Sequence, residues 1–210
     1  MNIVEPAVES YMADLASVDD EPVLMEMEER AKALDFPIIG RLCGRTLELL
    51  ARSIGARRIF ELGSGFGYSA YWFSRATGPH GEIHLTDMDP ANERRALKYL
   101  ERAGLADPID YHVSDAIEAL EATEGDFDIV YCDIDKLGYP QAWDVGRTRV
   151  RVGGFYISDN MLWSGRVAEA DKDETTAAID ATNRAIEADR NFRSTIVPTR
   201  DGVVVALRIS

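Results

Sequence analysis

The sequence predicts an α/β fold with a mainly parallel, seven-stranded sheet, and three observations support that prediction. From about residue 57 onward, short apolar runs alternate with longer segments of helical periodicity. No internal repeat, low-complexity tract or linker interrupts the alternation. Glycine-rich or acidic residues follow several of the apolar runs, as they do at ligand-binding strand ends in open parallel sheets. Together these features favour strand–helix–strand units with helices on both faces of the sheet.

Helical segments precede this alternation. We expect helices over about residues 6–17, 20–35 and 41–55. The second has an acidic run before it and Pro22 near its first position, which is typical of a helix start. The third is expected to bury one face that consists of Leu42, Thr46, Leu49, Leu50 and Ile54. We interpret residues 1–210 as a single domain with a helical N-terminal cap (1–55) and an α/β core (56–210).

The core is expected to contain seven strands with helices between them. The strands are predicted at 57–62, 82–87, 109–113, 127–132, 153–158, 194–198 and 203–209. The helices are predicted at 68–77, 90–104, 115–123, 139–149 and 173–189. Because only a short link ending at Gly202 joins the last two strands, we expect them to form an antiparallel hairpin at one edge. The predicted architecture is a Rossmann-like, doubly wound sheet with extra N-terminal helices.

Composition and charge restrict the classes of partner. Hydrophobic residues make up 46% and charged residues 29%, as in ordinary soluble globular proteins. The formal net charge of −14, without a basic run, opposes binding to nucleic acid or to an anionic membrane. The N-terminus lacks a signal-peptide pattern and no stretch is long and apolar enough to span a membrane. We therefore expect a cytoplasmic protein.

Cysteine and histidine usage gives no sequence pattern for a disulfide framework or a zinc site. The two cysteines, Cys43 and Cys132, belong to no ligand-spaced cluster, and Cys132 lies inside a predicted strand as a small apolar residue. The three histidines, His80, His84 and His112, are scattered along the chain. The sequence therefore disfavours a histidine-based metal site or catalytic dyad.

A glycine-rich turn follows the first predicted strand, where the sequence reads Glu61-Leu-Gly63-Ser64-Gly65-Phe-Gly67-Tyr-Ser69. Glycines at this spacing let the backbone approach a ligand closely, and the helix behind them offers free N–H groups to an anion. A purely structural tight turn is the alternative. Tyr68 occupies the position of the third glycine in the dinucleotide fingerprint. Together with the acidic Glu61, this favours S-adenosylmethionine over a dinucleotide as the nucleoside cofactor.

Two further strand ends carry residues suited to the rest of a nucleoside. Asp87 ends the second strand, about 20 residues beyond the glycines, where a carboxylate can accept hydrogen bonds from ribose hydroxyls. The alternative is that Asp87 caps the helix that starts near Pro90, but Asp89 is better placed for that role. The third strand ends at 114–116, and we expect Ser114, Asp115 and Ala116 to form the rim of an adenine pocket.

Oxygen-bearing side chains follow two more buried strands. Asp133 comes directly after the run 127–132, and Asp159 and Asn160 come after 154–158. Two carboxylates and an amide oxygen at one sheet edge suit a hard divalent cation such as Mg²⁺ or Ca²⁺. The alternative is that each aspartate caps the helix or turn that follows. The pairing of the two strand ends favours the metal site.

Three long motifs occur in the order found in a known family. They lie at residues 61–70, at 133–140 (Asp-Ile-Asp-Lys-Leu-Gly-Tyr-Pro) and at 153–165, where Gly153-Gly154 precedes Ser158-Asp-Asn-Met-Leu-Trp-Ser-Gly165. In these motifs the chain resembles the cation-dependent O-methyltransferases, the group of catechol and caffeoyl-CoA O-methyltransferases and their small bacterial relatives. The resemblance covers roughly residues 30–210.

The resemblance implies a role for each matched residue. It makes Asp133, Asp159 and Asn160 the ligands of a divalent cation (Mg²⁺, Ca²⁺ or Mn²⁺) and Lys136, beside Asp133, the general base. It implies that S-adenosylmethionine is held by Glu61, Gly63, Ser64, Gly65 and Ser69, by Asp87, Ser114, Asp115 and Ala116, and along the edge at Asp133. Trp163 matches a position that contacts the acceptor. It also implies a homodimer, with the N-terminal helices as the interface.

The sequence leaves four functions open. We favour a metal-dependent O-methyltransferase that acts on a small, catechol-like aromatic acceptor with two neighbouring hydroxyls. The same chemistry on hydroxyuridine in tRNA is disfavoured by the charge of −14. An NAD-dependent oxidoreductase is disfavoured by the glycine pattern and the metal ligands, and a non-catalytic cofactor-binding dimer by the intact catalytic motif. Residues 37–41 are less polar than in many relatives, so no particular acceptor is carried over.

Overall fold

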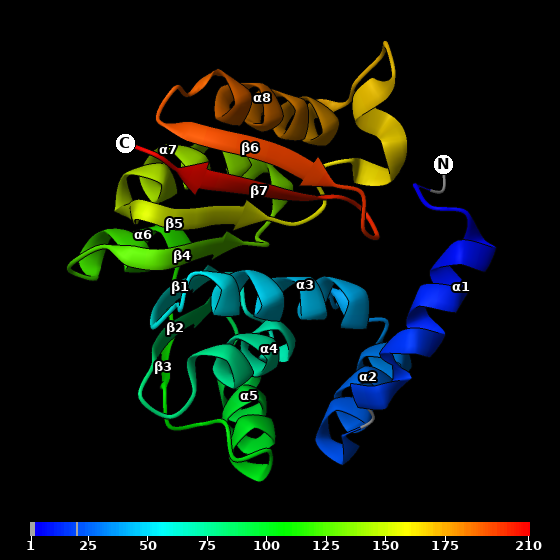
Figure 1. The fold of residues 1–210 in the computed structure, drawn as a ribbon, viewed down its shortest axis with the longest axis vertical. Helices are drawn as coiled ribbons and strands as arrows, with labels where there is room; N and C mark the ends of the chain where they lie inside the picture. The colour runs from blue at the N-terminus through cyan, green and yellow to red at the C-terminus, as the bar shows by residue number, and fades with distance from the viewer. Residues whose placement is uncertain (1–2, 20) are drawn as a thin grey trace.

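The computed structural model describes residues 3–19 and 21–210, and within them seven strands form one sheet in the order β3-β2-β1-β4-β5-β7-β6 (Figure 1). Strands β1 to β5 pair in parallel, whereas β7 runs antiparallel to both β5 and β6. This confirms the Rossmann-like sheet with its antiparallel C-terminal hairpin. The strands are β1 Arg58–Leu62, β2 Glu82–Asp87, β3 Ile109–Val113, β4 Phe127–Cys132, β5 Val150–Ser158, β6 Phe192–Val197 and β7 Val203–Arg208.

The helices agree with the predicted ones to within a few residues. They are α1 Pro6–Leu15, α2 Pro22–Leu34, α3 Gly40–Ser53, α4 Tyr68–Thr77, α5 Pro90–Arg102, α6 Ala116–Ala122, α7 Tyr139–Arg149 and α8 Glu174–Ala188, with short 3-10 helices η1 Ala16–Asp19, η2 Lys136–Gly138 and η3 Trp163–Ala168. The predicted start of the second helix at residue 20 lies outside the described residues. Across the described ranges, none of the helices has the length and apolar character needed to cross a membrane.

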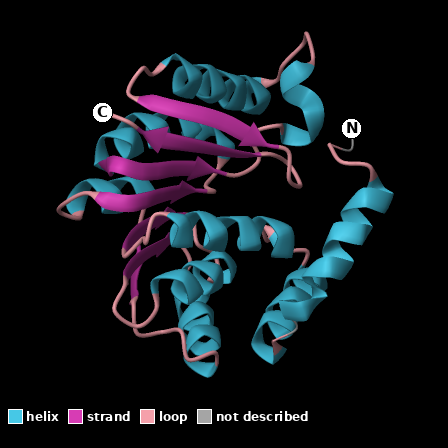
Figure 2. Cartoon of the chain, viewed as in Figure 1, coloured by secondary structure: helices cyan, strands magenta, loops and turns pink. Residues whose placement is uncertain are grey.

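Helices cover both faces of the sheet (Figure 2). An apolar core lies between the sheet and the helices on each face. On one face, α2, α3, α4 and α5 pack through residues such as Leu47, Trp72 and Leu100 against Ile59 and Ile129. On the other, α6, α7 and α8 pack against strand residues of opposite parity, which include Phe60 and Val130. The alternation along each strand therefore buries both faces, as expected for a doubly wound sheet. The division into a cap and a core at residue 55 stays a prediction.

The predicted buried face of α3 is only partly right, since Leu50 and Ile54 pack against the core as partly buried residues but the fully buried positions are different ones. The residues that are buried on it are Cys43, Gly44, Leu47 and Ala51, whereas Leu49 is 68% exposed. The cause is close packing against α4, because a Cβ atom on Gly44 would lie 2.2 Å from Nε1 of Trp72. The large indole of Trp72 is accommodated by Gly44, a residue that the pattern of apolar side chains does not mark.

Two of the three histidines, His84 and His112, lie side by side in space. Parallel pairing of β2 with β3 places His84 opposite Asp110, and Thr86 opposite His112. His84 and His112 thus come within hydrogen-bond distance on one face of the sheet. The positions of the histidines along the chain gave no sign of this proximity, and His84, His112 and Asp110 lie close enough together to be potential metal ligands.

Strand order reverses between β1 and β4, which lie side by side at the centre of the sheet. The chain leaves β1 towards one edge and leaves β4 towards the other, so the loops after these strands diverge. Divergent loops leave a crevice at the carboxyl ends of the strands, where ligands bind in folds of this kind.

Candidate functional site

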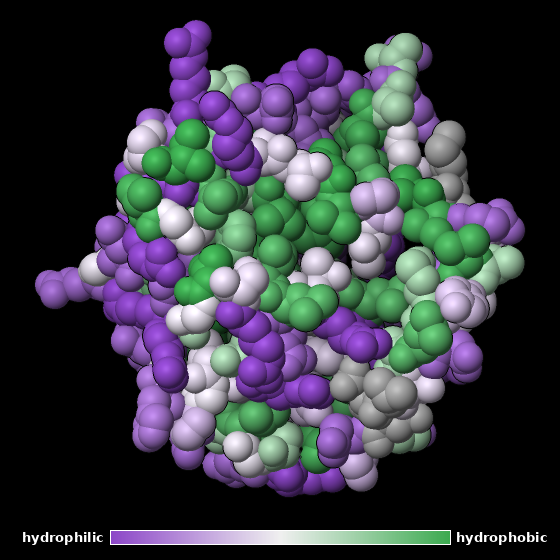
Figure 3. Space-filling view, viewed as in Figure 1, coloured by the Kyte–Doolittle hydropathy of each residue, from purple (hydrophilic) through white to green (hydrophobic). Residues whose placement is uncertain are grey.

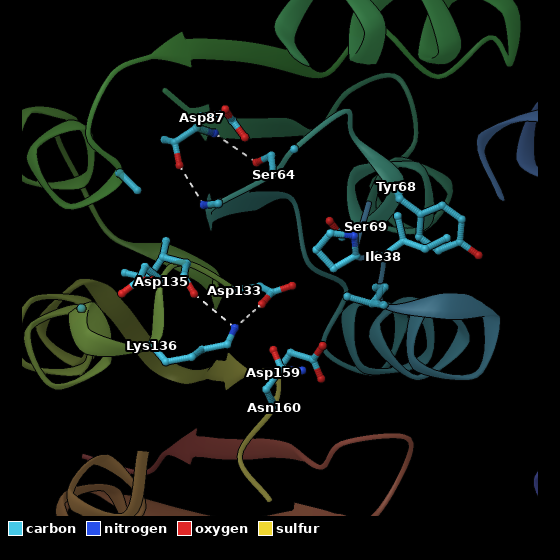
Figure 4. A pocket seen from close by; sticks show the side chains of 18 of the residues that line it. Ile38, Ser64, Tyr68, Ser69, Asp87, Asp133, Asp135, Lys136, Asp159 and Asn160 are labelled. Atoms are coloured by element: carbon cyan, nitrogen blue, oxygen red, sulfur yellow. Dashed lines mark hydrogen bonds and ion pairs between the residues drawn. The ribbon is translucent and has the colours of Figure 1, made fainter. Parts of the chain in front are cut away.

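A cavity of about 750 Å³ opens at this crevice. Figure 4 shows Ser64 and Asp87 on one side of it, Lys136, Asp159 and Asn160 on the other, and Asp133 between them. The structure thus brings nearly all the predicted site residues to one cavity. Those that line it are Gly63, Ser64, Gly65, Ser69, Asp87, Ser114, Asp115, Ala116, Asp133, Lys136, Asp159, Asn160 and Trp163.

The glycine turn between β1 and α4 needs glycine for its backbone conformation. Gly63, Gly65 and Gly67 all have positive φ angles, of 83°, 50° and 86°. Thr86 of β2 anchors the turn, since its hydroxyl accepts a hydrogen bond from the Gly63 N–H at 3.0 Å and its carbonyl accepts one from the Ser64 N–H at 2.7 Å. The turn is therefore held in place by the neighbouring strand and presents little side-chain bulk to the cavity.

Glu61 lies behind the cavity wall and is not part of it. Its side chain is fully buried, and it is absent from the residues that line the cavity. The Ser69 hydroxyl donates a hydrogen bond to Oε1 of Glu61. Burial raises the pKa of Glu61 to about 8, against the opposing effect of hydrogen bonds from Ser69 and Ser64, and the Asp133 charge adds to the rise. Glu61 thus positions Ser69, which does face the cavity.

The carboxylates after β2 and β3 also organise the helices that follow. Asp89 caps α5 by accepting a hydrogen bond from the Ala91 N–H, as expected, which leaves Asp87 at the cavity. Asp87 accepts hydrogen bonds from the Asp89 N–H at 2.7 Å and from the side-chain amide of Asn92 at 3.2 Å. Asp115 both caps α6 and lines the cavity, so its helix-capping alternative and its predicted rim position coexist.

Sheet register brings Asp133 and Asp159 together. Cys132 at the end of β4 pairs with Ser158 at the end of β5, and the next residue of each strand is an aspartate. Asp159 is buried, and its Oδ1 has no hydrogen-bond partner among the described residues. Burial and the neighbouring Asp133 carboxylate raise the pKa of Asp159 to about 7. A buried carboxylate oxygen without a partner is costly, so this arrangement suits a bound cation.

Lys136 lies on the 3-10 helix η2, just after Asp133. Its ammonium group is 2.8 Å from Oδ1 of Asp133, 3.1 Å from the Ile134 carbonyl and 2.7 Å from the Tyr139 hydroxyl. The Tyr139 hydroxyl in turn donates to the Asp159 carbonyl at 3.0 Å. The amine is therefore held at the cavity by a fixed set of partners and is not a freely solvated surface lysine.

Comparison with known proteins decides the family. Residues 14–209 match the model of a family described as O-methyltransferase. The chain belongs to this O-methyltransferase family. It is 33% identical over 180 residues to a catechol O-methyltransferase from Mycobacterium tuberculosis, with 82% of this chain and 80% of that protein covered. It is 29% identical over 188 residues to a catechol O-methyltransferase from Niastella koreensis, covering 87% and 84% of the two chains.

Solved structures of O-methyltransferases share the whole fold. One from Streptomyces achromogenes, in complex with S-adenosylmethionine, superposes with a TM-score of 0.87 at 25% identity and covers 97% of this chain and 96% of that one. One from Bacillus cereus, in complex with S-adenosylhomocysteine, gives 0.86 at 25% identity and covers 96% and 97%. The family and these relatives support S-adenosylmethionine-dependent O-methyltransferase activity.

The cavity also has walls outside the predicted site residues. Phe36, Pro37, Ile38 and Ile39 line it from the segment before α3, and Arg200 lines it from the turn between β6 and β7. Arg200 donates a hydrogen bond to the Ile38 carbonyl, which joins these two distant segments. No local pattern marks Arg200, because its place in the site depends on the return of the C-terminal hairpin to the sheet.

The same hairpin turn supports the loop after β5. The Met161 N–H donates to the Gly202 carbonyl and the Leu162 N–H to the Asp201 carbonyl, each at 2.9 Å. On either side of these contacts, Asn160 and Trp163 adopt left-handed backbone conformations with φ of 58° and 45°. Left-handed non-glycine residues are strained and persist where surrounding structure fixes them, often at functional sites.

Proposed function

We propose that this chain transfers the methyl group of S-adenosylmethionine to a hydroxyl oxygen of a small aromatic acceptor with two neighbouring hydroxyls. The observation that supports this most directly is that one cavity joins the glycine turn to the oxygen-rich group of Asp133, Asp159 and Asn160. A methyl donor at the turn and an acceptor at the oxygen-rich group would lie in the same enclosed space. Proximity and alignment are what an in-line methyl transfer requires.

The proposed donor site uses the residues at the glycine turn. Ser69, held by Glu61, would bind the methionine part of the donor, and the glycines of the turn would let that part lie close to the backbone. Asp87 has a carboxylate at the cavity that can accept hydrogen bonds from ribose hydroxyls. Ser114, Asp115 and Ala116 would border the adenine.

A divalent cation fits the residues on the other side. Asp133, Asp159 and Asn160 offer only oxygen donors, which suits Mg²⁺, Ca²⁺ or Mn²⁺, and the unpartnered Oδ1 of Asp159 needs a positive partner. A bound cation would orient a pair of acceptor hydroxyls and make their ionisation easier. The Lys136 nitrogen lies 2.8 Å from Oδ1 of Asp133, so it stands beside the proposed cation site.

Lys136 is proposed as the base. The acceptor oxygen gives its proton to the Lys136 amine, forms a bond to the methyl carbon, and the carbon–sulfur bond of the sulfonium breaks to leave a neutral thioether. Because Lys136 is anchored by Tyr139 and the Ile134 carbonyl, its nitrogen has a fixed position at the cavity. A fixed base within reach of the acceptor is the geometric requirement for general base catalysis.

The walls of the cavity support an aromatic acceptor. Phe36, Ile38 and Ile39 make one side apolar, and Trp163 lines the cavity near Asn160. We propose that Trp163 contacts the ring of the acceptor. The charge of −14 supports a small molecule over a nucleic acid.

A matched set of acceptors tests the proposed reaction. Enzyme treated with EDTA and dialysed is incubated with S-adenosylmethionine and 1,2-, 1,3- or mono-hydroxybenzene, with and without Mg²⁺. We expect methylation of the 1,2-compound only, and a rise of at least tenfold on adding Mg²⁺. Equal methylation of the three compounds, or activity unaffected by EDTA, would contradict the proposal. Methylation of a hydroxyuridine-containing tRNA but of no diphenol would instead favour the nucleic-acid alternative.

We further propose that the chain forms a homodimer through its N-terminal helices. Helix α1 has no buried residue, and Val8, Tyr11 and Leu15 are exposed at the spacing of a single helix face. Apolar side chains are visible on the flank where α1 lies (Figure 3). An exposed apolar stripe on a helix is typical of an interface, and a second copy would cover it.

A cytoplasmic location stays the prediction made from the sequence.

A further inference from the structure

A second group of potential metal ligands lies outside the cavity, on strands β2 and β3. Its members are His84, Asp110 and His112, and one ligand atom from each lies within 4.8 Å of the others. None of the three lines the cavity. Within the described residues this is the one group of three or more histidine, cysteine or acidic side chains with such an arrangement.

The distances between these ligand atoms are close to those of a tetrahedral site. Nδ1 of His84 lies 3.0 Å from Nε2 of His112, and Oδ2 of Asp110 lies 3.4 Å from the first nitrogen and 3.5 Å from the second. Ligands bound to zinc at about 2.0–2.2 Å in a tetrahedral arrangement are roughly 3.3–3.6 Å from one another. The three atoms therefore form one face of a tetrahedron of nearly the required size.

An outer partner fixes the ring of His84 in the orientation a ligand needs. Its other nitrogen, Nε2, is 2.6 Å from Oε1 of Glu82, and the same oxygen accepts a hydrogen bond from Nε of Arg58 at 2.9 Å. Because a carboxylate only accepts, Nε2 of a neutral His84 ring carries the hydrogen, which leaves the lone pair on Nδ1. A carboxylate behind a histidine is the usual outer partner in zinc sites.

Burial distinguishes this group from a chance meeting of surface side chains. The His84 side chain is only 7% exposed and stacks against the ring of Phe60 at a centroid distance of 5.6 Å. The His112 and Asp110 side chains are 30% and 61% exposed. The group thus has a fixed, buried member and an open side, through which a cation and a water ligand can enter.

We propose that His84, Asp110 and His112 bind a divalent transition-metal cation of the zinc type. Two imidazole nitrogens and one carboxylate suit Zn²⁺, Co²⁺ or Ni²⁺, whereas Mg²⁺ and Ca²⁺ prefer all-oxygen sites such as the one at Asp133 and Asp159. The proposed site ties the edge strand β3 to β2, so its occupation stabilises the edge of the sheet. It is independent of the proposed function, because none of its ligands lines the catalytic cavity.

Zinc titration of the full-length protein by isothermal calorimetry at constant pH tests the proposal. We expect micromolar or tighter binding by the wild type, and at least a tenfold loss of affinity in His112→Ala and in Asp110→Asn. The exposed His80 provides the matched control, because His80→Ala removes a histidine outside the group. Asp159→Asn is the second control, since it removes a ligand of the catalytic cavity and should retain this zinc binding.

Thermal unfolding supplies the second measurement. Zn²⁺ should raise the Tm of the wild type, of His80→Ala and of Asp159→Asn, and should leave the Tm of His112→Ala unchanged. Asp110→Asn keeps the size of an exposed side chain, so it remains informative if His112→Ala does not fold. Absence of zinc binding by the wild type, or unaltered binding in Asp110→Asn and His112→Ala, would overturn the proposal. Either result leaves the methyl-transfer assay unaffected, so the two proposals fail separately.

Discussion

At the scale of single residues, Asp159 combines burial with an unpartnered carboxylate oxygen. Such a group is unfavourable for the protein alone, because the charged form loses its water without gaining a partner. The arrangement is explained if the site is completed by a cation. Glu61 presents a related case, since it is also fully buried and its Oε2 has no partner among the described residues. Both carboxylates lead to predictions that can be measured.

Asp159→Asn is expected to weaken Mg²⁺ binding at least tenfold and to lower the rate of methyl transfer about a hundredfold. The substitution keeps the size of the side chain and removes the charge that would hold the cation. Calorimetric Mg²⁺ titration and a methylation assay measure the two effects. The control is Asp135→Asn, which changes a neighbouring carboxylate that also lines the cavity but caps the 3-10 helix η2. Equal losses in both variants would argue against a specific role for Asp159.

The stability of the ligand-free protein should depend on pH through Glu61. Its pKa is raised to about 8 in the folded protein from 4.5, so the folded state retains a proton that the unfolded state releases. The contribution of the protonated Glu61 to the stability of the folded state is complete below about pH 4.5. It falls as the pH rises and is lost once the pH passes about 8. Glu61→Gln, which is always neutral, should therefore gain stability relative to the wild type from pH 5 to pH 8. Denaturant unfolding at several pH values measures this, and parallel curves for the two proteins would contradict it.

At the scale of elements, the segments that follow β1 and β4 are in direct contact at Gly63 and Asp133. A Cβ atom on Gly63 would lie 2.5 Å from the backbone oxygen of Asp133, and neither backbone can rotate away as a side chain could. The glycine turn and the loop that carries Asp133 and Lys136 are thus packed against each other without space between them. The proposed cofactor site and the proposed metal site therefore share one rigid contact, which couples their geometry.

Gly63→Ala is therefore expected to damage both halves of the site. It combines the strain of a positive φ with a backbone collision that separates the turn from Asp133. The matched control is Gly55→Ala, because Gly55 also has a positive φ, of 59°, but a Cβ atom there would meet nothing within 4 Å. We expect Gly55→Ala to cost about 1–2 kcal/mol of stability and to bind S-adenosylhomocysteine normally. Gly63→Ala should lose more stability than Gly55→Ala and should bind S-adenosylhomocysteine at least tenfold more weakly. Similar stability and binding in the two variants would contradict the predicted collision.

At the scale of the whole molecule, the N-terminal helices are the part whose apolar surface is least accounted for by packing on the sheet. Helix α1 extends along one flank of the molecule, beside α2 and away from the strands (Figure 1). Its exposed Val8, Tyr11 and Leu15 have no partner in the apolar cores. In a homodimer these side chains would be covered, and the helix would gain the tertiary packing on which most helix stability depends.

Tyr11→Glu is expected to convert the proposed dimer into a monomer. A charge placed in the middle of the apolar stripe would be desolvated in the interface, which opposes association. Sedimentation velocity should give twice the chain mass of 23.3 kDa for the wild type and the chain mass for the variant. Ala13→Glu, at an exposed position on the opposite side of α1, should remain dimeric. A monomeric wild type would contradict the proposed assembly.

The amino-acid sequence was sufficient to predict the sheet and most of the cavity. Strand and helix periodicity are local properties, and parallel strands bring their carboxyl ends to one edge, so Gly63, Asp87, Asp133 and Asp159 could be predicted to meet. The features that could not be predicted depend on contacts between distant segments. The packed face of α3 follows from the fit of Trp72 against Gly44. The position of Arg200 follows from the return of the hairpin. The meeting of His84 with His112 follows from the register of β2 and β3, because strand register is fixed by the packing of the whole sheet and leaves no local pattern in the chain.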